Sequence, residues 1–157
     1  MGAPFRQNQL TSIIFHDNVE IIGEDAFMSN LLTEINLPGS LIEIEEDGFR
    51  DNLLTHVVLP DSLRTIGYRA FMDNELVSIV IPSSVTEWTF HPETGQGDHF
   101  HNNPLERIYT DLNNASALAA MLTAEVMGEQ TSAATVLHDT SGAVYHRGNG
   151  VGNRVWE

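Results

Sequence analysis

The amino-acid sequence predicts a mainly-β solenoid built from 22-residue units, and three observations support this fold class. The first is a constant interval: Leu10, Leu32, Leu54 and Leu76 open successive copies of one pattern. The second is that the same positions are apolar in every copy, and the third is that each copy closes on an asparagine. A fixed period of about 20–50 residues is typical of solenoids, in which each unit buries its apolar edge only against its neighbours.

Columns of equivalent residues define the unit. Apolar residues recur at the fourth and sixth positions, then further along the unit, and a phenylalanine precedes the closing asparagine. The columns are Ile13, Ile35, Val57 and Ile79; Phe15, Leu37, Leu59 and Ile81; Val19, Leu41, Leu63 and Val85; Ile22, Ile44, Ile66 and Trp88; Phe27, Phe49 and Phe71; and Asn30, Asn52 and Asn74. We expect the apolar columns to form a continuous core, and the asparagine amides to satisfy backbone groups in the turns.

The first residues continue the same pattern backwards. Projecting the repeat by 22 residues places Phe5 on the phenylalanine column and Asn8 on the asparagine column. The chain therefore begins midway through a repeat. Since an open solenoid end exposes apolar surface, we expect further repeats, or an oligomer contact, at this end.

Three ungapped repeats follow, at residues 10–31, 32–53 and 54–75. In each, the opening segment alternates and predicts a strand, which a proline such as Pro60 ends because it cannot donate to a ladder. The next portion, as in residues 62–66, predicts a second short extended piece. Gly23 and Gly67 then allow the chain to turn.

The fourth repeat contains an insertion. Its phenylalanine is delayed to Phe100, and the next strand opens at Leu105, which is 29 residues after Leu76 instead of 22. Seven residues are therefore inserted within residues 89–99. Insertions in solenoids form loops on one face, which is often the binding face.

A fifth strand at residues 105–111 ends the repeats, so we divide the chain into a solenoid, 1–112, and a tail, 113–157. Residues 113–128 carry apolar residues on one helical face and predict a helix. Residues 135–157 contain two apolar runs around a Gly-containing turn and predict a β-hairpin. We expect the helix and hairpin to cap the solenoid; a separate functional module is the alternative.

Composition excludes several classes of function. The chain carries 22 acidic and 7 basic side chains, a net charge of −15, which disfavours nucleic acid and anionic membrane surfaces as partners. It contains no cysteine, no apolar run long enough to span a membrane and no secretion signal at its start. No nucleophile, phosphate-loop or metalloprotease motif is present, so we expect neither enzymatic activity nor a cofactor.

The densest group of chemically active side chains surrounds the insertion. His91, His99 and His101 are of the type that binds zinc, nickel or copper. If Phe100 fills its core column, His99 and His101 flank it on the outward side and form a clamp with His91. The alternative is a polar loop that is histidine-rich by chance.

Strand alternation predicts a binding face. If the fourth and sixth residues of each opening segment point inward, the third and fifth point outward. Either this face binds a partner, or its residues merely favour β-structure and are covered by the tail or the insertion. The predicted partner-binding residues are Ile14, Asn36, His56, Val58, Val80, Arg107 and Tyr109.

The repeat unit L-T-x-[IV]-x-[FLI]-P-x-S-[LV]-x-x-I-G-x-x-A-F-x-x-N resembles the BspA-type leucine-rich repeat of bacterial and protist surface proteins. The closest copy contains Leu54, Pro60, Gly67, Phe71 and Asn74, and the resemblance covers residues 5 to about 111. It implies a curved solenoid with a parallel sheet on its concave face. It also implies an extracellular or cell-surface location.

The resemblance implies a non-catalytic adhesion domain that binds a protein or glycan on a host or neighbouring cell. Two alternatives stay open from the residues alone. One is a structural spacer or tip in a larger fibre or oligomer, and the other is a metal site at the histidine-rich insertion.

Overall fold

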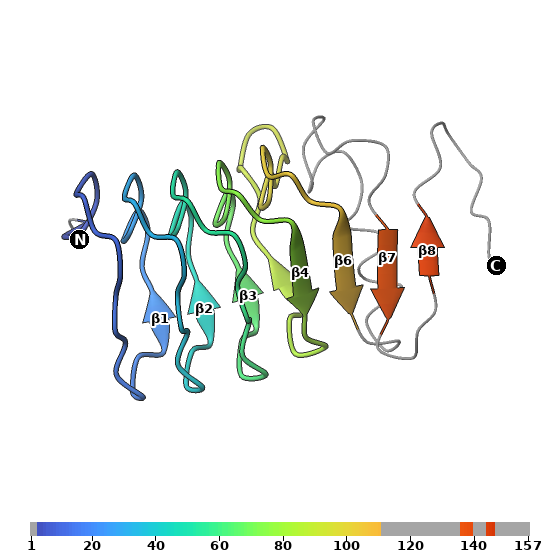
Figure 1. The fold of residues 1–157 in the computed structure, drawn as a ribbon, viewed down its shortest axis with the longest axis horizontal. Helices are drawn as coiled ribbons and strands as arrows, with labels where there is room; N and C mark the ends of the chain where they lie inside the picture. The colour runs from blue at the N-terminus through green and yellow to red at the C-terminus, as the bar shows by residue number, and fades with distance from the viewer. Residues whose placement is uncertain (1–2, 111–135, 140–143, 147–157) are drawn as a thin grey trace.

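The computed structural model describes residues 3–110, 136–139 and 144–146 of the chain. These residues form a mainly-β repeat fold with two sheets, and they contain no helix. Figure 1 shows successive repeats lying side by side in chain order, from the N-terminal end to β6. The mainly-β prediction is confirmed. Within the described residues, no helix is long and apolar enough to cross a membrane.

The first sheet joins one short strand from each repeat. Its strands are β1 (Ile21–Ile22), β2 (Glu43–Ile44), β3 (Thr65–Ile66) and β5 (Glu87–Trp88), which pair in this order and in parallel. The paired residues are 22 positions apart at every step. Backbone pairing thus confirms the repeat interval.

The second sheet continues from the fourth repeat into the tail. β4 (Ser78–Ile81), β6 (Arg107–Thr110) and β7 (Val136–Asp139) pair in parallel, and β8 (Val144–His146) pairs with β7 in antiparallel fashion. The step from β4 to β6 is 29 residues, which confirms the seven additional residues (29 − 22) of the fourth repeat.

The opening segments of the first three repeats differ from the prediction. They form no continuous strand, and Val58 makes an isolated parallel bridge to Val80 of β4. The hydrogen bond from Leu53 N to Leu32 O is 2.9 Å long, but the next one, from Thr55 N to Thr33 O, already measures 3.3 Å. Regular pairing in these repeats is found in the second extended pieces instead.

The core consists of the predicted columns. Leu32, Leu54 and Leu76 are fully buried, as is Phe49. The phenylalanine rings stack along the repeats with near-parallel planes and centroids 5.3, 5.4, 5.7 and 5.7 Å apart. Large side chains at close-packed spacing make this column a main source of stabilisation. The stacked rings are Phe5, Phe27, Phe49, Phe71 and Phe100.

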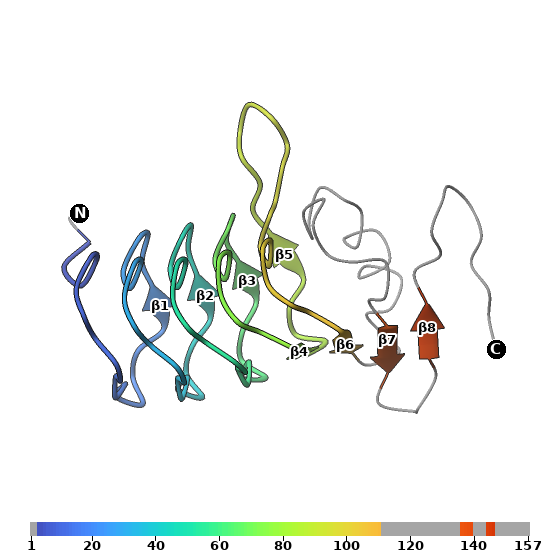
Figure 2. The ribbon, with the colours of Figure 1, turned by 45° about the horizontal axis from the view of Figure 1, so that its top comes forward.

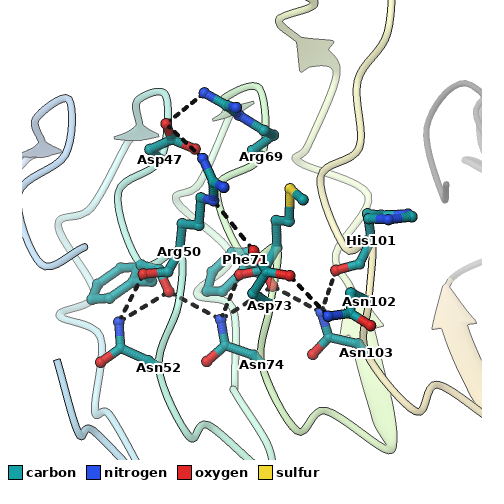
Figure 3. Close-up of polar contacts among 12 residues, drawn as sticks. Asp47, Arg50, Asn52, Arg69, Phe71, Asp73, Asn74, His101, Asn102 and Asn103 are labelled. Carbon is teal, nitrogen blue, oxygen red and sulfur yellow. Dashed lines mark hydrogen bonds and ion pairs between the residues drawn. The ribbon is translucent and has the colours of Figure 1, made fainter. Parts of the chain in front are cut away.

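The asparagine column forms the predicted ladder (Figure 3). Asn74 Nδ2 donates to the carbonyl oxygens of Phe49 and Phe71, at 3.0 and 3.2 Å, and its Oδ1 accepts from Leu54 N at 3.1 Å. Asn30, Asn52 and Asn103 make equivalent bonds. Each amide therefore ties its own turn to the turn of the preceding repeat.

Two positions in each repeat have left-handed backbone conformation. One column contains Asp25, Asp47, Arg69 and Asp98, and the other contains Gln7, Ser29, Asp51, Asp73 and Asn102. Aspartate and asparagine tolerate this conformation better than most residues, which accounts for the many acidic residues in the turns.

Part of the predicted tail lies within the described residues. β7 and β8 pair as the predicted hairpin, with Leu137 opposite Tyr145. The predicted helix at 113–128 lies outside the described residues, and the division at 112–113 stays a prediction.

Candidate functional site

The opening segments present one face of the molecule to solvent. On β4, Ile79 and Ile81 are buried whereas Val80 is 49% exposed. The equivalent residues of earlier repeats are more exposed, at 75% for Val58 and 91% for Ile14. We name the outward positions of residues 11–14, 33–36, 55–58, 77–80 and 106–109 the sheet face.

Every residue predicted to bind a partner lies on the sheet face and is exposed or half-buried; these residues are Ile14, Asn36, His56, Val58, Val80, Arg107 and Tyr109. Backbone pairing brings three of them onto adjacent segments, since Val58 bridges to Val80 and Val80 pairs with Tyr109 on β6. The structure therefore groups Val58, Val80 and Tyr109 in one place, whereas Ile14 lies two repeats before Val58.

Sequence reasoning missed three exposed apolar residues, one on this face and two beside it. Val77 on the sheet face is 45% exposed, and Leu31 and Leu53, which precede the buried leucines of their repeats, are 43% and 42% exposed. A signal for the two leucines was present in the sequence. Each repeat has one buried leucine position at its start, so the first leucine of each Leu-Leu pair must lie outside it.

A shallow groove of about 570 Å³ runs along the turns next to the sheet face. Its lining consists of three consecutive residues from each of three repeats. They are Asp51, Asn52 and Leu53; Asp73, Asn74 and Glu75; and Asn102, Asn103 and Pro104. The lining contains three carboxylates and no basic side chain, so the groove is acidic. The repeat pattern did not predict it.

Ion pairs connect neighbouring repeats above this groove (Figure 3). Arg50 Nε lies 3.3 Å from Asp73 Oδ2, and Arg69 Nη2 lies 2.7 Å from Asp47 Oδ2. Burial raises the pKa of Asp47 above its ordinary value, although Arg69 and then Arg50 act in the opposite direction. These pairs connect repeat to repeat and leave the groove carboxylates Asp51 and Glu75 exposed.

The insertion is a hairpin at residues 90–96. Thr89 N donates to Ile66 O as Gly67 N donates to Ile44 O, and Gly97 O accepts from Arg69 N as Tyr68 O accepts from Asp47 N. Thr89 and Gly97 thus occupy consecutive repeat positions, and the residues between them are the additional ones. His91 N donates to Gln96 O at 2.8 Å and closes the hairpin. Figure 2 shows this loop, before β6, projecting beyond the other turns.

The histidines of the insertion are not arranged as expected. His99 is fully buried, so the premise that it points outward beside His101 is wrong. Its ring packs edge-on against Trp88, with centroids 4.9 Å apart, and its Nε2 lies 2.9 Å from Thr89 O. His91 instead packs against Tyr68. Among the described residues, no group of three His, Cys, Asp or Glu side chains is placed to hold a metal ion.

The repeats match the model of a known protein family. A model of the BspA type leucine rich repeat region matches residues 3–94, with 6 copies. The chain belongs to the BspA-type leucine-rich repeat family. Repeats of this family are generally protein-binding or adhesion repeats and are typically non-catalytic. No curated protein and no solved structure matches the chain.

The BspA-type match defines which parts of the site are family features. It begins just before Phe5, where the projected pattern begins, and ends within the inserted hairpin. The sheet face from Ile14 to Val80 therefore lies inside the matched repeats. β6, with Arg107 and Tyr109, lies beyond the match but continues the sheet by pairing with β4.

Proposed function

We propose that this BspA-type repeat domain is a non-catalytic, protein-binding domain of a surface or secreted protein. In this proposal the repeats form a curved solenoid with the sheet face on its concave side. The main support for this proposal is the exposed apolar column of Ile14, Val58 and Val80, which has no role in the core. Contiguous exposed apolar surface, here formed by the adjacent Val58 and Val80, is typical of interaction sites.

A protein partner fits this face better than a glycan. The side chains grouped at its centre, Val58 and Val80, are aliphatic and offer no hydrogen bond to a sugar hydroxyl. Burying them against a partner's apolar side chains would contribute about 25 cal/mol per Å² of surface removed from water. The half-buried Tyr109 beside them adds an aromatic ring of the kind enriched at interfaces.

The test is a selection of random peptides displayed on phage, using the whole chain as bait. We expect selected peptides to bind the wild-type chain and to lose at least about tenfold in affinity for the Val58→Asp/Val80→Asp variant, because buried charge opposes apolar contact. Circular dichroism and urea unfolding of the variant should stay close to wild type, since both side chains point to solvent.

The matched control places the same charges elsewhere. Ile21 and Ile42 are also exposed apolar residues, at 53% and 43%, but they lie in the second extended pieces of their repeats. The Ile21→Asp/Ile42→Asp variant should bind the selected peptides as wild type does. Peptides that bind the Val58→Asp/Val80→Asp variant equally well would remove the sheet face as the contact and place it elsewhere on the chain.

A further inference from the structure

The acidic groove lies next to the sheet face in the chain, with Leu53 between them. Leu53 lines the groove and is 42% exposed, and the chain runs from it into the opening segment that carries Val58. An extended chain rises about 3.3 Å per residue, so the Cα atoms of these two residues lie within about 16 Å of each other. A single partner segment can therefore touch both regions.

The groove offers negative charge that the molecule itself does not neutralise. Asp73 is bound by Arg50 and by Asn102 Nδ2, at 3.3 and 2.9 Å. The exposed side chains of Asp51 and Glu75, in contrast, make no hydrogen bond or ion pair with any residue that the structure describes.

The asparagines of the groove are uncharged, and the buried ones have no amide group left for a partner, whereas the exposed Asn102 donates its Nδ2 to Asp73. The Asn74 and Asn103 amides already bind backbone groups on both sides through oxygen and nitrogen. What the groove presents to a partner is therefore carboxylate, beside a face on which Glu34 and Glu106 outnumber Arg107.

We propose that the partner is a cationic protein segment, which lays apolar side chains on Val58 and Val80 and places arginine or lysine against Asp51 and Glu75. This inference rests on the proposed function and adds the chemistry of the partner. Charge complementarity is the argument for it. An anionic partner would meet like charge in the groove, whereas a cationic one is attracted both locally and by the net charge of −15.

The test uses short synthetic peptides of equal length and measures binding by fluorescence anisotropy. The first alternates valine with arginine, the second valine with glutamate, and the third serine with arginine. We expect the valine–arginine peptide to bind at least about tenfold tighter than either of the others, because the site requires both apolar contact and positive charge. Equal binding of the valine–glutamate peptide would overturn the proposal.

Two variants with the same net charge distinguish binding of the peptide in the groove from its general attraction to the acidic protein. Asp51→Asn/Glu75→Gln removes the free groove carboxylates, and asparagine suits the left-handed backbone of Asp51. Asp17→Asn/Glu20→Gln removes two exposed carboxylates outside the groove. We expect the groove variant to bind the valine–arginine peptide about tenfold more weakly, and the control less than about twofold.

The measurements distinguish failure of the groove assignment from failure of the cationic partner and of the protein-binding function. An equal loss in both variants would show attraction by net charge alone and overturn the groove assignment. Selected phage peptides that depend on Val58 and Val80 but carry acidic or neutral residues would overturn the cationic partner while leaving the protein-binding function in place.

Discussion

Single polar side chains connect the repeats in addition to the apolar core. Asn52 is 5% exposed and makes four hydrogen bonds, to Leu32 N and to the carbonyl oxygens of Phe27, Phe49 and Arg50. The side-chain amide of Asn52 thus forms hydrogen bonds with backbone groups of two neighbouring turns. Since buried backbone groups must be paired, the asparagine column follows from the shape of the turn.

Asn52→Ala should therefore lower the free energy of unfolding by about 2–4 kcal/mol, because several buried backbone groups lose their partner. Urea unfolding measures this change. Asn36→Ala is the matched control, since Asn36 is exposed on the sheet face, and it should change stability by less than about 0.5 kcal/mol. Equal effects of the two substitutions would contradict the ladder.

Asp47 makes stability depend on pH. Burial raises its pKa above the ordinary value of 3.8, so the folded protein binds this proton more tightly than the unfolded chain does. The stabilisation is complete below pH 3.8 and is lost as the pH rises through the raised pKa. Asp47→Asn removes this titration and keeps a residue that tolerates the left-handed backbone.

The difference in unfolding free energy, wild type minus Asp47→Asn, should therefore fall as the pH rises from acid to neutral. Urea unfolding of both proteins over this range measures it, and the effects of other groups cancel in the difference. A difference that grows with pH would mean that the ion pair with Arg69 outweighs burial.

At the scale of elements, the inserted hairpin is an addition to an otherwise regular turn. Thr89 and Gly97, at its two ends, make the same interrepeat hydrogen bonds as Gly67 and Tyr68 in the preceding repeat. The backbone on either side therefore continues as if the hairpin were absent.

Deleting residues 90–96 and joining Thr89 to Gly97 should give a folded chain. We expect a change in unfolding free energy within about 1 kcal/mol, since the loss of the Phe90 and His91 ring contacts is small. Cooperative urea unfolding and an unchanged circular dichroism spectrum would verify this. Deleting the same number of residues inside a regular repeat, at 46–52, provides the control and should abolish folding.

At the scale of the whole molecule, the contribution of a phenylalanine ring to the free energy of unfolding depends on its position along the row of repeats. Phe49 has a stacked ring on each side and is fully buried, whereas Phe5 is 47% exposed and stacks on Phe27 only, among the residues that the structure describes. In a repeat array, each repeat is stabilised by its interfaces with the nearest neighbours. A substitution in an inner repeat therefore weakens two interfaces, whereas one in an end repeat weakens a single interface.

Phe49→Ala should lower the free energy of unfolding by about 3–5 kcal/mol, and Phe5→Ala by about 1 kcal/mol or less. Thermal and urea unfolding of the two variants test this ratio. Equal destabilisation by the two substitutions would mean that the rings do not act through their neighbours.

The sequence by itself determined the interval, the core and the ladder. A constant period identifies the spatial neighbour of every residue, so Phe49 must meet Phe27 and Phe71, and Asn52 must face the preceding turn. The outward position of Val58 and Val80 followed from the same periodicity. These are properties of one unit that repetition propagates.

Tertiary structure alone decided which extended pieces pair, how His99 is buried and where the groove lies. The opening segments of the first three repeats have no regular pairing, whereas the second extended pieces form strands at Ile21–Ile22 and its equivalents, and the period alone does not specify which of the two pieces pairs. His99 follows an insertion without a counterpart in other repeats, so no period placed it against Trp88. The groove arises between turns of three repeats, and a pattern read within one unit does not describe the space between units.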